Sequence, residues 1–356
     1  MTVAADRKPI RLREGLALLL LLCCGACASH WTVRTANGSI PLQWPYPPNP
    51  PKVTYLRSLT GFSVSKGARS VLRAIVYGRN KGDRNGFILP VAVATGADGR
   101  IAVADPGAGC VHWYDPARQR YLRLTGPGGG RILSPVAVAF DDASRLWVSD
   151  SAGRVLAFGP EAEFLFELRS AGAEPLQRPT GLAYSPARKL LYVVDTLAGK
   201  VHAFDARGEF AFSFGQRGEG EGSFNFPTHI TRSPAGELYV TDALNFRIAI
   251  FDESGRPLGS FGHHGDGSGD LAMPKGIAVD RDGTVYVVDS LFDNVQLFDR
   301  QGTFLLTLGR RGVDSGEFWL PSGAFLDGQG KLYVCDSYNR RIQVFLVSEQ
   351  YAQPAS

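Results

Sequence analysis

The chain has 356 residues, of which 42 are glycine, 22 are proline and 44% are hydrophobic, so a disordered, collagen-like or coiled-coil chain is excluded. Lys and Arg total 38 and Asp and Glu total 34, and the net charge of +4 is too small for binding driven by bulk charge, whether to nucleic acid or to an acidic substrate. Five cysteines in a chain of this length do not form a disulfide scaffold.

The N-terminus reads as an export signal. Four basic residues between Arg7 and Arg13 precede an apolar run over 15–24, which is shorter than the roughly 20 residues that span a bilayer. The sequence Cys24-Gly-Ala-Cys27 follows and resembles the lipobox of bacterial lipoproteins, with Cys24 where Leu is usual. We expect a signal peptide over 1–26 and a lipid on Cys27; a conventional cleavage site nearby and an uncleaved anchor are the alternatives.

These features predict an exported protein, lipid-anchored to a membrane and facing the periplasm. Ala28, rather than Asp, at the second mature position favours the outer membrane of a Gram-negative bacterium. Cleavage before Cys27 would remove four basic and two acidic residues and leave a net charge of +2. Cys110 and Cys335 would remain in a compartment that permits disulfides.

The next segments connect the anchor to the folded domain. Residues 27–52 include Trp44-Pro-Tyr-Pro-Pro-Asn-Pro-Pro51, and we interpret them as a semi-rigid, proline-rich tether, with a docking motif for a partner's aromatic groove as the alternative. Apolar residues at helical spacing over 66–77 predict a short helix. Residues 349–356 are read as a tail.

A repeat occupies the rest of the chain. A proline recurs at Pro90, Pro135, Pro179, Pro227, Pro274 and Pro321. An aspartate that closes an apolar run recurs at Asp105, Asp150, Asp195, Asp242, Asp289 and Asp336, with spacings of 45, 45, 47, 47 and 47. Internal repeats of this length predict a repeat architecture of six units.

Each unit has four short apolar or alternating runs separated by Gly, Asp and Asn turns, which is typical of an antiparallel meander. Six such sheets predict an all-β, six-bladed β-propeller over 53–348, with four-stranded antiparallel blades over about 88–346. The last unit supplies only three strands, so we expect residues 53–59 to pair with it as an N-terminal closing strand. One short helix, over 66–77, would precede blade one.

The motifs of two units resemble the NHL repeat. Gly222-Ser-Phe-Asn-Phe-Pro227, the run ending at Asp242, and Asn245-Phe-Arg-Ile-Ala-Ile-Phe251 match it, as do the equivalent runs over 316–345. Blade five is read as keeping the asparagine, at Asn294. The resemblance covers about 88–346, and together with the stalk it is similar to bacterial lipoproteins with six-bladed NHL propellers. The fold alone does not imply a function.

A contact surface is predicted where the turns between second and third strands share one face with the blade connections. This channel-mouth face would present Leu244, Phe246, Arg247, Lys275, Phe292, Tyr338 and His229. Aromatic and long apolar residues at loop tips favour a binding surface, with packing between neighbouring loops as the alternative. The six repeated aspartates are expected to be structural, because a turn needs a hydrogen-bond acceptor in every copy and catalysis does not.

An enzymatic site is the alternative hypothesis. Peptide-amidating lyases, which the fold resembles, imply three histidines from different blades on zinc, and only His229 stands at such a position here. His263 and His264, with Asp266 and Asp270, could hold a cation in a glycine-rich loop. No nucleophile motif of the type G-x-S-x-G is present.

We therefore expect a non-catalytic, membrane-anchored periplasmic propeller, monomeric and without a cofactor, that recognises a protein or peptide through the channel-mouth face. The alternative is a zinc- or calcium-dependent lyase or hydrolase near His229. Arg247, Lys275, Arg340 and Arg341 form only a weak basic face, so no nucleic acid is expected. A disulfide between Cys110 and Cys335, in neighbouring blades one and six, is a further possibility.

Overall fold

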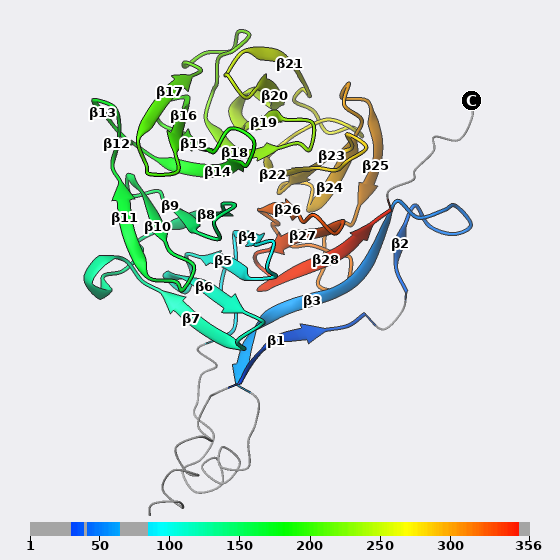
Figure 1. The fold of residues 1–356 in the computed structure, drawn as a ribbon. Coiled ribbons are helices and arrows are strands. Elements are labelled where there is room, and N and C mark those ends of the chain that lie inside the picture. The colour runs from blue at the N-terminus through cyan, green and yellow to red at the C-terminus, as the bar shows by residue number, and fades with distance from the viewer. Residues whose placement is uncertain (1–29, 39–40, 65–84, 349–356) are drawn as a thin grey trace, which may run out of the picture.

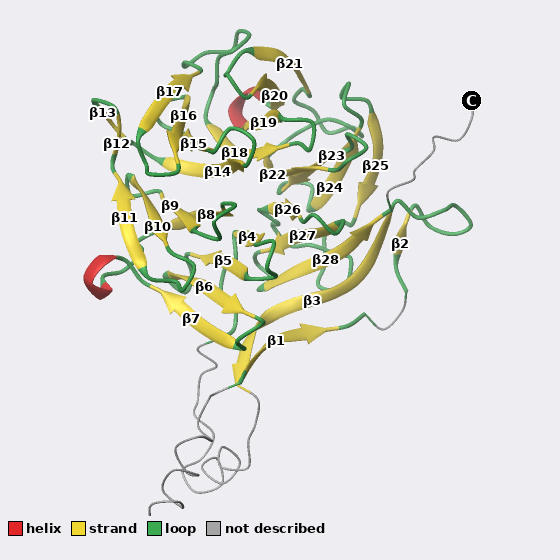
Figure 2. Cartoon of the chain, in the orientation of Figure 1, coloured by secondary structure: helices red, strands yellow, loops and turns green. Residues whose placement is uncertain are grey.

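The computed structural model describes residues 30–38, 41–64 and 85–348. Six antiparallel sheets are arranged around a central axis, which confirms the predicted six-bladed propeller (Figure 1). Within the described residues the only helical segments are two single 3₁₀ turns, η1 (Pro127–Gly129) and η2 (Ala243–Asn245), so Figure 2 is almost entirely strand and loop. None of the described helical segments is long and apolar enough to cross a membrane.

The first three blades run outward from the axis in chain order. Blade one comprises β4 (Ala92–Thr95), β5 (Ile101–Asp105), β6 (Cys110–Asp115) and β7 (Arg120–Leu124). Blade two comprises β8 (Pro135–Phe140), β9 (Leu146–Asp150), β10 (Arg154–Phe158) and β11 (Phe164–Leu168). A two-stranded ribbon of β12 (Ser170–Ala171) and β13 (Glu174–Pro175) follows. Blade three comprises β14 (Pro179–Ser185), β15 (Leu190–Asp195), β16 (Lys200–Asp205) and β17 (Phe210–Phe214).

The last three blades repeat the plan, except that blade six takes its outer strand from the other end of the chain. Blade four comprises β18 (Pro227–Arg232), β19 (Glu237–Asp242), β20 (Arg247–Asp252) and β21 (Pro257–Phe261). Blade five comprises β22 (Pro274–Val279), β23 (Val285–Asp289), β24 (Asn294–Phe298) and β25 (Phe304–Leu308). Blade six comprises β26 (Ala324–Leu326), β27 (Lys331–Asp336), β28 (Arg341–Val347) and β3 (Val53–Val64).

The second strands lie in the interior of the molecule. All five residues of β9 and of β23 are buried, because each blade is covered on both faces by its neighbours. Such strands read as continuous apolar runs rather than as an alternation of apolar and polar residues. Two glycines allow the inner strands to approach closely: a Cβ on Gly276 would lie 2.3 Å from the nitrogen of Ala324, and one on Gly323 would lie 2.4 Å from the oxygen of Val91.

The ring closes between the two ends of the chain, as predicted. β3 pairs antiparallel with β28, with Leu59 opposite Ile342 and Val53 opposite Val347. The strand is longer than the predicted 53–59, because it continues to Val64 and pairs there with a further strand. Hydroxyl groups add cross-links between neighbouring blades, for example Ser337, which donates to the oxygen of Pro90 at 2.7 Å.

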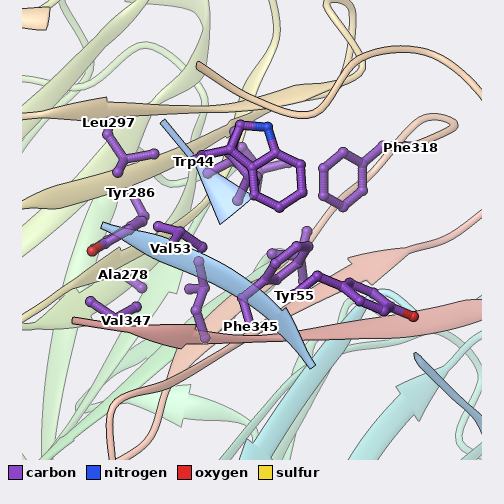
Figure 3. Packing of buried hydrophobic residues seen from close by; sticks show 14 residues of the cluster. Trp44, Val53, Tyr55, Ala278, Tyr286, Leu297, Phe318, Phe345 and Val347 are labelled. Atoms are coloured by element: carbon purple, nitrogen blue, oxygen red, sulfur yellow. The ribbon is translucent and has the colours of Figure 1, made fainter. Parts of the chain in front are cut away.

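The segment read as a tether differs from that expectation. β1 (Trp31–Ala36) adds a fifth strand to blade six by pairing with β3, and β2 (Gln43–Trp44) also pairs with β3. Trp44 is 5% exposed and packs near Val53, Phe318 and Phe345, as Figure 3 shows. The described part of the segment is thus attached to the propeller. Burial of the large aromatic side chain of Trp44 removes apolar surface from water and so stabilises this attachment.

Several expectations fall outside the described residues. These are the signal peptide and the lipidated Cys27, the helix over 66–77 and the tail over 349–356.

Candidate functional site

The repeated aspartates join two parts of each blade at one face. All six are buried, and each accepts a backbone N–H from the connection that enters its own blade. The donors are Ile88 and Leu89 to Asp105, Leu133 and Ser134 to Asp150, Gln177 and Arg178 to Asp195, Asn225 to Asp242, Ala272 and Met273 to Asp289, and Trp319 to Asp336. The carboxylates therefore satisfy backbone donors that would otherwise be unpaired.

Blade five shows what this joining does. Asp289 accepts from the nitrogen of Met273 at 3.0 Å and from the nitrogen of Leu291 at 3.0 Å. Met273 belongs to the blade connection and Leu291 to the turn after the second strand, so one carboxylate holds both segments side by side. Both side chains are exposed, and Leu291 is 61% exposed.

Large exposed apolar side chains recur on this face in every blade. We call this set the apolar ring: Ile88, Leu133, Leu197, Leu244, Met273, Leu291, Trp319 and Tyr338. Each member either precedes a repeated proline by one or two residues or follows a repeated aspartate by two. In blade six the rings of Trp319 and Tyr338 lie 5.7 Å apart, centroid to centroid.

Two of the predicted face residues belong to the ring. Leu244 is 52% exposed and Tyr338 is 53% exposed. Phe246 and Phe292 are half-buried instead, and Phe246 packs against the ring of His264 at 4.3 Å. For Phe246 the packing between loops that was the alternative interpretation describes the surroundings better, whereas Phe292 lines a small cavity.

Of the two predicted basic residues of this face, Arg247 is engaged internally and Lys275 is half-buried. Arg247 donates to Asp242 at 2.9 Å and to the oxygens of Gly220 and Ser223. Lys275 is half-buried, and burial lowers the pKa of Lys275 while the charge of Asp289 opposes that change. Arg247 is therefore not available to an acidic partner.

His229 lies on the channel wall and not in the apolar ring. It is the second residue after Pro227 on β18, and its Nδ1 lies 3.1 Å from the hydroxyl of Thr228. Burial, with a smaller contribution from the positive charge of Lys275, lowers the pKa of His229 to about 3. The imidazole is therefore neutral at physiological pH.

The donor atoms do not fit a zinc or calcium centre at His229. Over the described residues, no three His, Cys, Asp or Glu side chains lie together in an arrangement that could hold a metal ion. The corresponding wall positions carry Ala92, Ala137, Gly181, Gly276 and Gly323. A catalytic zinc site needs three protein ligands, and this wall offers one.

The other candidate ligands, His263 and His264, contact different residues of the glycine-rich loop and of its neighbour. His263 pairs with Asp270 at 2.6 Å, between Nε2 and Oδ1. His264 packs on Phe246 instead of turning toward this pair. The glycine-rich loop thus holds one histidine–carboxylate pair.

The main cavity opens on the face opposite the apolar ring. It has a volume of about 490 Å³ and is walled by the inner strands of all six blades. Its lining continues into the turns after the first strands, including Pro186, Pro234, Asp280, Arg281 and Asp327, and includes no member of the apolar ring. The hollow of the channel and the predicted contact surface therefore belong to different faces.

Cys110 and Cys335, the cysteines among the described residues, are both free and buried. The disulfide considered from the sequence does not form. The thiol of Cys110 accepts from Arg123 Nε at 3.2 Å, and burial raises the pKa of the Cys335 thiol. Both residues serve packing in their blades.

Sequence reasoning missed most of the apolar ring, although the repeat contained the signal. The offset of two after the aspartate that selected Leu244 and Tyr338 also selects Leu197 and Leu291. The residues before the prolines required the further knowledge that their backbone is held against the same aspartate. A second misreading concerns Asn294: it pairs with Asp289 just as Arg247 pairs with Asp242, so it occupies the arginine position of the motif and not the asparagine position.

Comparison with known proteins supports the propeller class. The sequence model of the NHL repeat matches residues 318–345, which span the end of the blade connection and most of blade six. A search of curated proteins gives no significant match.

Similar solved structures share the fold at low sequence identity. Virginiamycin B lyase from Staphylococcus aureus is 13% identical with a TM-score of 0.55, over 73% of this chain and 96% of that chain. A gluconolactonase from Xanthomonas campestris is 17% identical with a TM-score of 0.56, over 74% and 87%. An auxiliary nutrient binding protein from Bacteroides thetaiotaomicron is 14% identical with a TM-score of 0.56, over 73% and 69%. These neighbours have different functions, and identities this low establish the architecture only.

Proposed function

We propose that this chain is a non-catalytic binding protein that recognises a protein or peptide partner through the apolar ring. The main observation in support is that the two faces of the disc differ in their exposed apolar side chains. Large apolar side chains are exposed on the face of the apolar ring in every blade. Exposed apolar groups that gather on one surface are typical of interaction sites.

The opposite face provides the contrast. Its turns, over 96–100, 141–145, 185–189, 233–236, 280–283 and 327–330, contain no large apolar residue. They carry charged pairs instead, such as Lys189 with Asp142 and Arg145 with Asp141. One face is therefore suited to water and the other to a partner that removes apolar surface from water.

The lyase or hydrolase alternative has less support. The neighbouring solved structures include a lyase and a gluconolactonase, but they also include a nutrient binding protein. Because the wall around His229 lacks further metal ligands, no observation of this chain favours that chemistry.

The test is partner capture by the full-length protein. Substituting Leu244, Leu291 and Tyr338 together by serine removes apolar surface from three adjacent blades without touching a buried residue. We expect photo-crosslinking in the native cell envelope to lose its specific product. The matched control replaces Phe210 and Leu258, which are exposed on outer strands, by serine. Equal capture by the ring variant and the control would refute the proposal.

We also propose that the protein is exported and anchored by a lipid on Cys27, facing the periplasm. The support is the sequence pattern alone: the basic segment, the short apolar run and the cysteine after Cys24-Gly-Ala. Stable attachment would follow because several acyl chains insert together. Cys27→Ser should move the protein from the membrane fraction to the soluble fraction, and unchanged membrane association would contradict the lipid anchor.

A further inference from the structure

An arginine holds the blade connection in blades four and six. In blade six, Arg341 donates to Asp336 Oδ2 at 2.7 Å and to the oxygens of Asp314 and Glu317 at 2.6 and 2.9 Å. In blade four, Arg247 makes the same three contacts with Asp242, Gly220 and Ser223. The planar guanidinium suits a site made of one carboxylate and two carbonyls.

The blade connection of blade five has the same backbone arrangement as that of blade six. The nitrogen of Asp270 donates to the oxygen of Gly267 at 3.2 Å, as the nitrogen of Glu317 donates to the oxygen of Asp314 at 3.1 Å. Gln296 donates to the oxygen of Asp270 at 2.7 Å, and Gln343 to that of Glu317 at 2.6 Å. The carbonyls of Gly267 and Asp270 therefore have the same placement as the two carbonyls that bind Arg341.

The arginine itself is missing from blade five. Asp289 lies opposite Asn294 in the ladder, as Asp336 lies opposite Arg341. Asn294 is too short to reach the two carbonyls, and Phe292 replaces the residue that corresponds to Asn339. The space that a guanidinium fills in blade six is thus left open.

A cavity of about 240 Å³ occupies this place. Its lining consists of Asp266, Gly267, Ser268, Phe292, Asn294, Gln296 and Thr307. The Oδ1 atom of Asn294 is buried and has no hydrogen-bond partner. Among the described residues, no cation forms a salt bridge with Asp289, although the charge of Lys275 interacts with it over a longer distance, whereas Asp242 and Asp336 each have an arginine. A buried acceptor without a donor is costly, so the cavity favours a ligand that brings donors and positive charge.

We propose that this blade-five cavity binds a guanidinium group from outside the chain. The ligand would donate to Asn294 Oδ1 and to the carbonyl of Gly267, would be attracted by Asp266 and Asp289, and would pack beside Phe292. An ammonium ion lacks the planar fork that these acceptors match. The group could belong to free arginine or to an arginine side chain of a peptide, and the proposal does not depend on the role of the apolar ring.

The test measures binding of methylguanidinium to the full-length protein by NMR titration, with methylammonium at equal ionic strength as the control probe. We expect methylguanidinium to bind at least about tenfold more tightly than methylammonium. Equal responses to the two ions would overturn the proposal, independently of any variant.

A matched pair of variants tests the position of the site. Asn294→Arg supplies the guanidinium from within and should abolish methylguanidinium binding, whereas Asn294→Asp should strengthen it several-fold. Unchanged affinity in both variants would also overturn the proposal. Free L-arginine and an arginine-containing peptide, titrated in the same way, then identify the source by whichever binds more tightly.

Discussion

Lys52 and Asp280 form a buried ion pair, with 2.8 Å between Nζ and Oδ2. Lys52 immediately precedes the closing strand β3, and Asp280 begins the turn after the first strand of blade five. The same ammonium donates to the oxygen of Ser348, and the hydroxyl of Tyr286 donates to the same carboxylate oxygen. One charge pair therefore ties both ends of the described propeller to a neighbouring blade.

Lys52→Met should destabilise the protein by about 3 kcal/mol, because removal of one partner leaves a buried carboxylate without its cation. Urea unfolding of the purified protein measures the change. Arg207→Met removes an arginine that is 85% exposed from its pair with Asp205, so it should cost less than about 1 kcal/mol. Similar decreases in the free energy of unfolding in the two variants would show that the buried Lys52 pair contributes no more to stability than an exposed pair.

Trp44→Ala should cost about 3–5 kcal/mol, because the indole is buried among residues of blades five and six. Tyr46→Ala is the matched control, since this aromatic lies two residues further and is 64% exposed. Thermal or denaturant unfolding distinguishes them. If both substitutions were equally mild, the segment would behave as the semi-rigid tether that the sequence suggested, without attachment to the propeller.

Arg247→Ala should lower stability by about 2–3 kcal/mol without changing partner capture at permissive temperature. The side chain is bound to Asp242 and two carbonyls, so its loss leaves internal acceptors unpaired. Unfolding and crosslinking on the same preparation separate the two effects. Loss of capture with normal stability would place Arg247 in the binding surface after all.

His229 should make folding sensitive to acid. Its folded-state pKa of about 3 lies below the ordinary value of 6.5, so the unfolded chain binds the extra proton first. The contribution is complete above pH 6.5 and is lost as the pH falls from 6.5 toward 3, by up to roughly 1.4 kcal/mol per pH unit. His229→Gln should flatten this part of the stability profile, as measured by urea unfolding at each pH. Parallel profiles of wild type and variant would contradict an imidazole that is neutral in the folded protein.

Much of the architecture could be predicted because it is local and repeated. The spacing from Asp105 to Asp336 specifies six units, and the four apolar runs in each of the first five specify four-stranded sheets. The three-stranded last unit required a partner strand, and the apolar pattern over 53–59 supplied it. These features depend on strand periodicity and turn residues, which any window of the sequence contains.

Other features depend on which distant segments meet. Trp44 is hydrophobic in the sequence, but only the assembled blades provide the pocket that buries it. Phe246 and Phe292 stand at loop tips like Leu244, yet both are half-buried, and Phe246 packs on His264 of the neighbouring loop. The open cavity of blade five also needs the tertiary structure, because the absence of an arginine at Asn294 matters only where two carbonyls already face that position. The sequence by itself determined the number and order of the blades through short-range periodicity. Contacts between residues far apart in the chain decided which side chains are exposed, on which face the channel cavity opens and which hydrogen-bond acceptors stay unpaired.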